Sequence, residues 1–237
     1  MTDSSRRDEL ALRLAEVRRR IAKACDAAAR DVSEITLIAV TKTRPASDVR
    51  LLSELGVTDV GENRDAEAAP KAAQCDDLAL KGLTWHFIGQ LQTNKAASVV
   101  RYASVVHSVD RLRLIRALGR AAGRAGRVVE CLVQVSLDGD PSRGGAPADQ
   151  VPALAEALEA EAGLVLGGVM AVAPLGIAPA DAFARLLVSA AAVRAVRPTA
   201  RVISAGMSGD LEAAVEAGAT HLRIGTALLG DRGPGVG

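Results

Sequence analysis

Short runs of apolar, often β-branched residues alternate along the chain with longer amphipathic stretches. The apolar runs predict eight β-strands, at residues 35–40, 56–60, 84–89, 104–109, 128–135, 164–172, 200–204 and 221–225. Between the strands, apolar residues recur at steps of three and four, which predicts helices at 46–55, 64–73, 94–102, 110–125, 147–162, 179–196 and 210–217. A further helix is expected at 8–30, before the first strand.

This alternation is typical of parallel strands that are joined by crossover helices. Eight such units in 237 residues fit a single (β/α)₈ TIM barrel, a fold that takes about 250 residues. A doubly wound open sheet is the alternative that the pattern leaves open. We expect one α/β domain at residues 8–230, with no second domain, and flexible tails at 1–7 and 231–237.

Composition narrows the classes of function. The net charge is +1 and aromatic residues make up 2%, which argues against a nucleic-acid partner. No apolar stretch approaches the roughly 20 residues that span a bilayer, and the amino terminus lacks the apolar core of a signal peptide. Three scattered cysteines, Cys25, Cys75 and Cys131, do not form a disulfide framework. We therefore expect a cytoplasmic protein without a membrane partner.

Lys42 is the first residue with a chemical signal. Five of the 29 basic residues are lysines, and Lys42 alone among them ends an apolar strand. In a barrel, function lies at the carboxyl ends of the strands. There an amine can form a Schiff base, which a guanidinium cannot, and desolvation favours the nucleophilic neutral form. A lysine that merely extends its amine into solvent fits the same position.

A phosphate site is the second signal. The residues 206–209 (GMSG) precede a predicted helix, where backbone N–H groups and the Ser208 hydroxyl can hold an anion. The last strand leads into Gly225 and Thr226, and barrels often bind phosphate with the loops after strands seven and eight. Arg223 lies just before this turn. The alternatives are that Ser208 caps its helix and that Arg223 forms an ion pair at the rim.

An amine beside a phosphate cradle fits a ligand that carries both a carbonyl and a phosphate. Pyridoxal 5′-phosphate (PLP) is one such ligand, and a sugar phosphate bound by a Schiff-base aldolase is another. The residues alone do not choose between them. No metal site is expected, because His86, His107 and His221 have no metal-ligand spacing.

Longer motifs resemble a known family. The segments AVTKT (39–43), GEN (61–63), WHFIGQLQTNK (85–95), HSVD (107–110) and GMSGDLEAAVEAGATHLRIG (206–225) are similar to the pyridoxal phosphate homeostasis protein family. The resemblance extends from about residue 10 to residue 230. It implies a barrel of the alanine racemase amino-terminal domain type and a role in intracellular vitamin B6 balance.

The resemblance also implies a set of cofactor-binding residues. PLP is expected as an aldimine on Lys42, with its phosphate on the Ser208 loop and its pyridine nitrogen facing Arg223. Asn63 and His86 are expected beside the cofactor. The full set is Lys42, Asn63, His86, Met207, Ser208, Arg223, Gly225 and Thr226, without a metal.

This chain departs from the family pattern at four positions. Ala205 stands where a methionine is usual, and Arg64 stands where a tyrosine is frequent. After the fifth strand, Ser136 and Arg143 replace an asparagine and a lysine. An arginine cannot react with an aldehyde, so the departures bear on secondary PLP transfer and leave Lys42 and Ser208 untouched.

Little or no catalysis is expected. Arg223 keeps its proton, so the pyridine nitrogen stays unprotonated and the ring is a weak electron sink. Racemases of this type take a second base, a tyrosine, from an additional domain, whereas this chain has one tyrosine, Tyr102. We predict a monomeric carrier that exchanges PLP with PLP-dependent apo-enzymes. A PLP-dependent amino-acid racemase or lyase and a purely structural scaffold are the alternatives.

Overall fold

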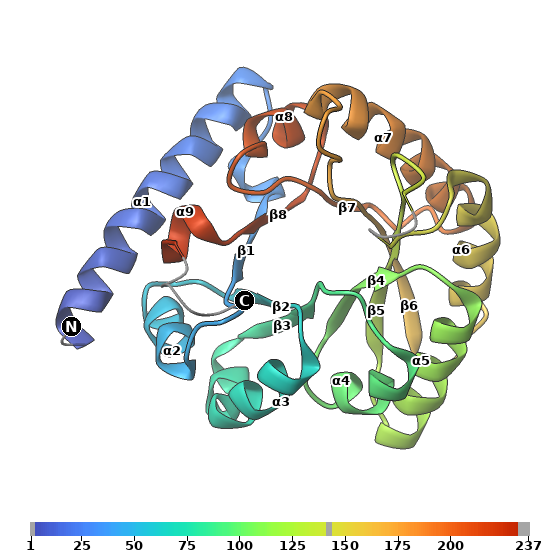
Figure 1. Cartoon of the computed structure of the whole chain (residues 1–237), viewed down its shortest axis with the longest axis horizontal. Helices are drawn as coiled ribbons and strands as arrows, with labels where there is room; N and C mark the ends of the chain where they lie inside the picture. The colour runs from blue at the N-terminus through green and yellow to red at the C-terminus, as the bar shows by residue number, and fades with distance from the viewer. Residues whose placement is uncertain (1–2, 141–143, 232–237) are drawn as a thin grey trace.

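A closed eight-stranded barrel forms the centre of the molecule (Figure 1). The computed structural model describes residues 3–140 and 144–231. The strands are β1 (Thr36–Val40), β2 (Asp59–Glu62), β3 (Thr84–Phe87), β4 (Val105–Val109), β5 (Val129–Gln134), β6 (Leu164–Met170), β7 (Val202–Ser204) and β8 (His221–Ile224). All neighbours are parallel, and β1 pairs with β8 through Ile38 and Arg223. The predicted barrel is confirmed, and the open sheet is wrong because the first and last strands pair.

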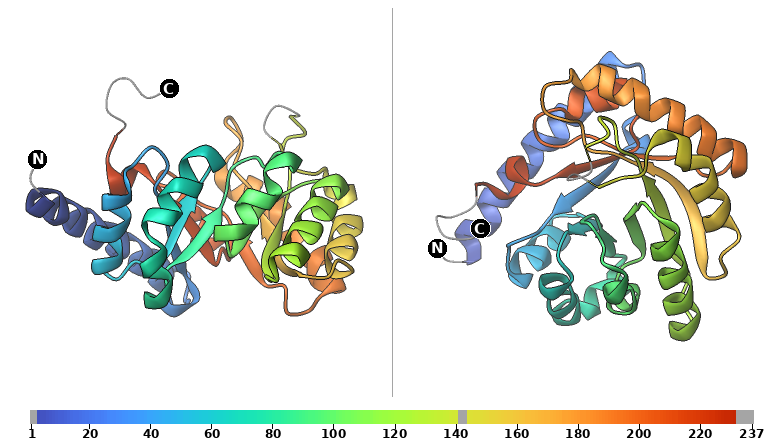
Figure 2. Two further views of the ribbon diagram at one scale, coloured as in Figure 1. Left: turned by 90° about the horizontal axis from the view of Figure 1, so that it is seen from below. Right: turned by 45° about the vertical axis from the view of Figure 1, so that its right-hand side comes forward.

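Helices surround the barrel on its outside (Figure 2). They are α1 (Asp3–Ala27), α2 (Ala46–Glu54), α3 (Asp65–Gln74), α4 (Ala96–Tyr102), α5 (Leu112–Ala125), α6 (Val151–Glu159), α7 (Pro179–Val196), α8 (Leu211–Glu216) and α9 (Thr226–Leu229). Short 3-10 helices are η1 (Val32–Glu34), η2 (Asp76–Lys81), η3 (Thr93–Lys95) and η5 (Ala148–Gln150). The additional helix before the first strand is therefore confirmed, and α9 is an element that the periodicity did not predict.

Helix α1 starts earlier than the sequence pattern indicated. Residues 3–7, which we expected in a flexible tail, form its first turns. Arg6 explains the difference, because its guanidinium donates to the Asp48 carboxylate at 2.7 Å and to the Leu229 carbonyl oxygen at 3.2 Å. These contacts attach the start of the chain to α2 and to the end of α9. Residues 1–2 and 232–237 lie outside the described residues.

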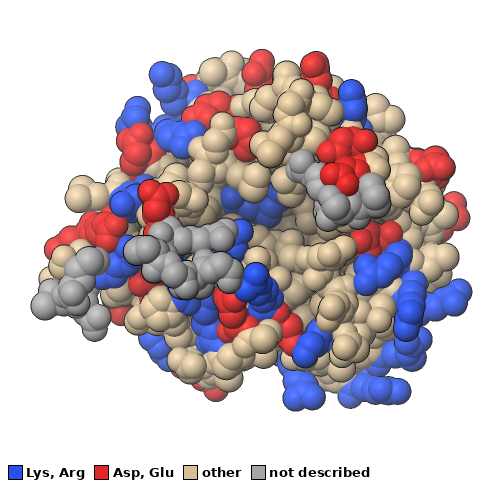
Figure 3. Space-filling model, in the orientation of Figure 1, with Lys and Arg blue, Asp and Glu red and all other residues tan. Residues whose placement is uncertain are grey.

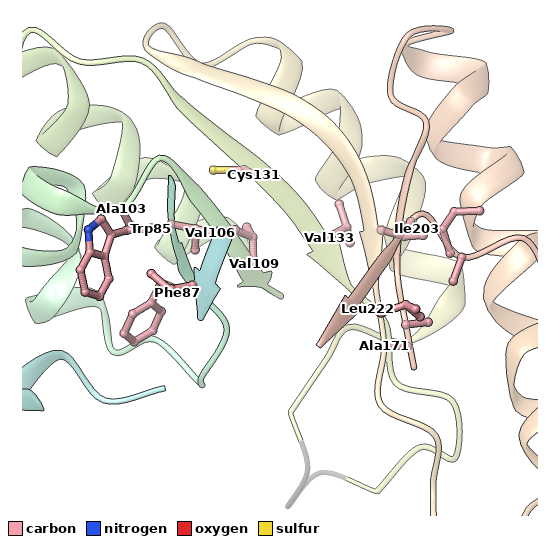
Figure 4. Close-up of a cluster of buried hydrophobic side chains, with 14 of the residues drawn as sticks. Trp85, Phe87, Ala103, Val106, Val109, Cys131, Val133, Ala171, Ile203 and Leu222 are labelled. Atoms are coloured by element: carbon pink, nitrogen blue, oxygen red, sulfur yellow. The ribbon is translucent and has the colours of Figure 1, made fainter. Parts of the chain in front are cut away.

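The apolar core lies between the barrel and its helices. Figure 4 shows Trp85 and Phe87 projecting to one side of β3, beside Val106 and Val109 of β4. Cys131 of β5 is fully buried, and burial raises the pKa of its thiol. All three cysteines are free and buried, in agreement with the expectation of no disulfide framework.

The second strand is displaced toward the carboxyl end of its predicted range. We predicted 56–60, whereas β2 covers Asp59–Glu62. Gly56 ends the preceding helix with a φ of +79°, a conformation that favours glycine. Gly61 looks like a strand breaker in sequence, but a Cβ there would lie 3.0 Å from Ile38 Cγ2. The close packing inside the barrel therefore requires this glycine and brings Glu62 into the strand.

Candidate functional site

A pocket of about 290 Å³ lies at the carboxyl ends of the strands, close to the lower end of the range for small-ligand sites. Its lining combines the turn after β1, Ile88 after β3, the loop after β7, and the end of β8 with α9. Six of the eight predicted cofactor residues line it: Lys42, Met207, Ser208, Arg223, Gly225 and Thr226. Figure 3 shows basic side chains in a hollow near the middle of this face.

Lys42 belongs to a tightly held turn. The Thr41 N–H donates to the Gly61 carbonyl oxygen, and the Arg44 N–H donates back to the Thr41 carbonyl oxygen, each at 3.0 Å. Thr43 has a φ of +63°, which is rare for a β-branched residue and costs about 1–3 kcal/mol. Its N–H donates to Glu67 Oε2 at 3.0 Å, which holds it in this conformation. The Lys42 amine is therefore attached to a fixed backbone.

A buried ion pair lies directly behind this turn. Lys71 Nζ of α3 is 2.5 Å from Glu62 Oε1 and donates to the Thr41 carbonyl oxygen at 2.8 Å. The Thr41 hydroxyl donates to the same Glu62 oxygen at 2.6 Å. Burial raises the pKa of Glu62. This pair, which the sequence analysis missed, engages Lys71 and leaves Lys42 as the lysine that lines the pocket.

The loop after β7 has a shape that only glycine permits at its start. Gly206 has a φ of +92°, and a Cβ there would lie 2.5 Å from the Ala214 Cβ. Ser208 Oγ accepts a hydrogen bond from the Ala227 N–H at 3.2 Å. Ser208 thus joins the loop to α9, and the alternative that it caps its own helix is wrong.

This loop and α9 present unsatisfied backbone donors. Within the described part of the chain, the N–H groups of Ser208, Gly209 and Thr226 donate to no protein acceptor, and all three residues line the pocket. Unpaired N–H groups at loop and helix starts bind anions such as phosphate. The predicted cradle therefore has the donors that a phosphate group needs.

Helix α1 supports the cradle from behind. Arg20 donates to the Ser208 carbonyl oxygen at 3.1 Å and pairs with Glu212 of α8 at 2.8 Å. On the other side, Arg44 donates to the Gly230 carbonyl oxygen at 2.7 Å. These arginines take up carbonyl groups of the cradle, whereas the Met207 N–H donates to Asp210 Oδ1 at 2.6 Å and the described N–H groups of Ser208, Gly209 and Thr226 have no protein acceptor.

Arg223 places a buried positive charge beside the pocket. It is 4% exposed and donates to Ser204 Oγ at 2.6 Å and to the Ala171 carbonyl oxygen at 2.8 Å. No carboxylate among the described residues pairs with it, so the rim ion pair considered above is absent there. Burial lowers the pKa of Arg223 to about 10, so it remains charged at neutral pH. Its remaining N–H donors are available to a ligand.

Asn63 and His86 do not line this pocket. Asn63 follows β2, is half-buried, and has its backbone against Gly89, where a Cβ would lie 2.1 Å from the Asn63 carbonyl oxygen. His86 lies inside the barrel, 2% exposed, where its ring contacts Asp59 and His107. Neither position was expected, because a strand pattern shows which residues share a face and not how deep they lie.

Three of the four departures from the family pattern, at Ala205, Arg64 and Ser136, are described, and none of these three lines the pocket. Ala205 is buried, and Ser136 Oγ accepts a hydrogen bond from the Gly139 N–H at 3.1 Å. Arg64 is exposed and lies 3.7 Å from Glu67. Arg143 is outside the described residues. No described group of three or more His, Cys, Asp or Glu side chains is placed to hold a metal ion. No helix in the described ranges could cross a bilayer.

The closed barrel with a helix before its first strand is the fold of the alanine racemase amino-terminal domain. The sequence model described as alanine racemase, N-terminal domain, matches residues 12–233. Alanine racemase from Corynebacterium glutamicum shares the fold, with a TM-score of 0.70 and 14% identity over 94% of this chain and 60% of that one.

Nearer relatives identify the family within this class. The pyridoxal phosphate homeostasis protein of Mycobacterium tuberculosis H37Rv is 45% identical, covering 96% of this chain and 94% of that protein. The protein of that name from Escherichia coli K12 is 34% identical over 95% and 97%. PipY of Synechococcus elongatus, solved with PLP bound, has a TM-score of 0.80 and 35% identity over 93% of this chain and 100% of PipY. The chain belongs to the pyridoxal phosphate homeostasis protein family.

Proposed function

We propose that this protein binds PLP in the pocket at β1 and β8 and serves PLP homeostasis with little or no turnover. One observation carries the proposal: the pocket brings together an amine, unpaired backbone donors and a buried guanidinium. These groups match the aldehyde, the phosphate and the ring nitrogen of PLP. The PipY structure with PLP bound and the names of the relatives support the same ligand.

Each part of the pocket has a separate task in this proposal. Bound PLP supplies an aldehyde carbon, which Lys42 Nζ holds as a Schiff base with release of one water molecule. The Ser208 loop and Thr226 bind the phosphate through their N–H groups. Arg223 donates to the ring nitrogen and, because it keeps its proton, leaves that nitrogen unprotonated.

The single tyrosine of the chain supports a carrier over a racemase. Tyr102 ends α4, outside the barrel, and its hydroxyl lies 3.4 Å from Asp65. Burial raises the pKa of this phenol, and its ring packs edge-on against Trp85. Tyr102 does not line the pocket, so it is not placed to serve as the second base of a racemase.

We propose that the protein acts in the cytoplasm, in line with its three free thiols, and that it acts there as a monomer. We further propose that it passes PLP to PLP-dependent apo-enzymes. Met207 supports an accessible ligand, because this lining residue is 39% exposed at the edge of the pocket.

The test is the visible absorption of purified protein, followed by borohydride reduction and peptide mapping. A band that reduction abolishes, with the pyridoxyl mass on the Lys42 peptide, supports the proposal. Lys42→Ala should lose the band, whereas Lys95→Ala, which changes an exposed lysine, should keep it. A full complement of covalently bound PLP in Lys42→Ala would contradict the proposal.

The enzyme alternative needs its own measurement. Exchange of the α-proton of an amino acid with solvent deuterium reports carbanion chemistry directly. We expect exchange at the rate of free PLP. Exchange at a catalytic rate would replace the carrier with a racemase or lyase.

A further inference from the structure

A row of buried polar side chains crosses the inside of the barrel and ends at the pocket. Asp59 Oδ1 lies 2.9 Å from His86 Nε2, and His86 Nδ1 lies 2.9 Å from His107 Nε2. His107 Nδ1 lies 2.9 Å from Ser204 Oγ, which accepts a hydrogen bond from Arg223 at 2.6 Å. We call these five residues the barrel relay. One of its ends is a carboxylate, and the other is the guanidinium that lines the pocket.

The relay runs through the interior of the barrel and not along its wall. His107 is on β4 and Ser204 is on β7, and these strands are not neighbours in the closed order of the sheet. His86, His107 and Ser204 are at most 2% exposed, whereas the side chain of Asp59 is 18% exposed. The relay therefore reaches solvent at Asp59 and is sealed from it until it meets the pocket at Arg223.

Hydrogen-bond chemistry gives the relay a direction. A guanidinium only donates, so Ser204 Oγ accepts from Arg223 and has its own proton to give to His107 Nδ1. His107 then carries its proton on Nε2 and donates it to His86 Nδ1. His86 carries its proton on Nε2 and donates to Asp59. This single arrangement makes all four hydrogen bonds of the row, from Arg223 to Asp59.

The surrounding charges are consistent with this arrangement. Burial holds the pKa of His107 well below its ordinary value. Although burial opposes it, hydrogen bonds from His86 and Thr58 keep the pKa of Asp59 below its ordinary value. The other titratable groups that face the relay are His221 of β8, 6.3 Å from the His86 ring, and Glu130 of β5. Burial lowers the pKa of His221 to about 4, and Asp210 acts on Arg223 from the β7 loop.

We infer that Asp59 is the remote counter-charge of Arg223, and that His86, His107 and Ser204 are positioning residues that aim this guanidinium at the ring nitrogen of the ligand. The inference rests on the proposed function. A direct ion pair would occupy the donors of Arg223. Three intervening side chains instead place the negative charge at the far end of the barrel and leave donors for the ligand.

Binding of two ligands tests the inference. The probes are PLP and its 1-deaza analogue, in which a C–H replaces the ring nitrogen. Ser204→Ala should weaken PLP by about 10-fold, as expected for one lost hydrogen bond to a charged group, and the analogue by about 2-fold at most. Asp59→Asn keeps an acceptor oxygen and removes the charge. It should also weaken the binding of PLP more than that of the analogue, by a smaller factor than Ser204→Ala. His221→Gln, outside the relay, is the matched control and should affect both ligands equally.

Equal weakening of both probes by Ser204→Ala and Asp59→Asn would overturn the inference, because it would indicate a structural role only. Arg223→Gln separates the two levels of the proposal. If this change leaves PLP binding intact, the part of the proposed function in which Arg223 binds the ring nitrogen is wrong. If it impairs PLP binding while Ser204→Ala and Asp59→Asn do not, only the relay fails.

Nitrogen-15 NMR of the histidine side chains tests the relay without any ligand. We expect the Nε2–H tautomer for His107 at neutral pH, and loss of this fixed tautomer in Asp59→Asn or Ser204→Ala. The Nδ1–H tautomer in the unmodified protein would overturn the inference. This measurement on the unmodified chain also keeps the inference testable if a variant does not fold.

Discussion

Two buried polar clusters flank the pocket, and they hold their charges in opposite ways. Outside the barrel wall, Lys71 and Glu62 are in direct contact at 2.5 Å. Inside the barrel, Arg223 is separated from Asp59 by three intervening side chains, those of Ser204, His107 and His86. In a direct pair the carboxylate occupies the N–H donors of the cation, so the cation cannot bind a ligand. In a separated pair some N–H donors of the cation stay available to a ligand. Under the proposed function, the difference gives one buried cation a structural task and the other a ligand-binding task.

The largest effect is expected from breaking the direct pair. Lys71→Met leaves the Glu62 carboxylate buried without its partner, which should lower the free energy of unfolding by about 3–5 kcal/mol. Lys71→Met with Glu62→Gln should restore much of the loss, because no charge is then buried. Denaturant unfolding measures both, and a fully additive double variant would contradict direct pairing.

Protonation sharpens this prediction. Burial raises the pKa of Glu62 in the folded protein, and loss of Lys71 raises it further. A carboxyl whose pKa is raised by folding stabilises the fold at low pH and loses this contribution as pH rises through the raised pKa. The loss in the free energy of unfolding that Lys71→Met causes should therefore become smaller as the pH is lowered toward the ordinary pKa of a glutamate.

His221, which faces the separated cluster from β8, should respond to acid in the opposite sense. Burial lowers the pKa of His221 from 6.5 to about 4. The unfolded chain takes up this proton near its ordinary pKa and the folded chain does not, so stability falls as the pH drops through this range. The lowered pKa of His221 should reduce the free energy of unfolding at acidic pH by up to about 3 kcal/mol. His221→Gln should flatten the pH profile of unfolding, and an unchanged profile would show that His221 is not held neutral.

A smaller effect is expected when Arg223 keeps its charge but loses its shape. Arg223→Lys retains a cation, but it cannot reach Ser204, Ala171 and the ligand with one planar group. We expect PLP affinity to fall by about 10- to 30-fold, with a small change in stability. Absorption titration with PLP measures the first quantity and thermal unfolding the second. Unchanged PLP affinity would show that charge alone suffices.

The smallest effect concerns the support of the cradle. Arg20→Ala removes the bond to the Ser208 carbonyl oxygen and the pair with Glu212, which should weaken PLP binding by about 1 kcal/mol. Arg19→Ala is the matched control, because Arg19 pairs only with Glu16 of the same helix in the described part of the chain. Similar losses in both variants would show that Arg20 has no special role.

The sequence predicted the elements well because each is a local pattern. Strand and helix periodicities located all eight strands, and helix 179–196 has the predicted bounds. The boundary of β2 was misplaced because Gly61 looks like a breaker until the neighbouring Ile38 side chain is known. Four-residue α9 is too short to show a period.

The pocket lining was predicted where one motif supplies a whole part, as residues 206–209 do for the loop after β7. Contacts were missed where partners come from distant segments. Lys71 and Glu62 are nine residues apart on different elements, and the contact of Arg20 with Ser208 joins residues 188 positions apart. The relay did leave a signal, because polar residues on alternate positions of several strands must share the interior of a closed barrel.

The pairing of β1 with β8 places the pocket on the seam where the barrel closes. Lys42 follows the first strand, and Gly225 and Thr226 follow the last, so a ligand held by both spans the join between the two ends of the chain. Such a ligand would connect the loops that follow β1 and β8. Its binding free energy is added to the stability of the closed ring and to no state in which the ring is open. Under the proposed function, cofactor occupancy would therefore report that the barrel is closed from β1 to β8.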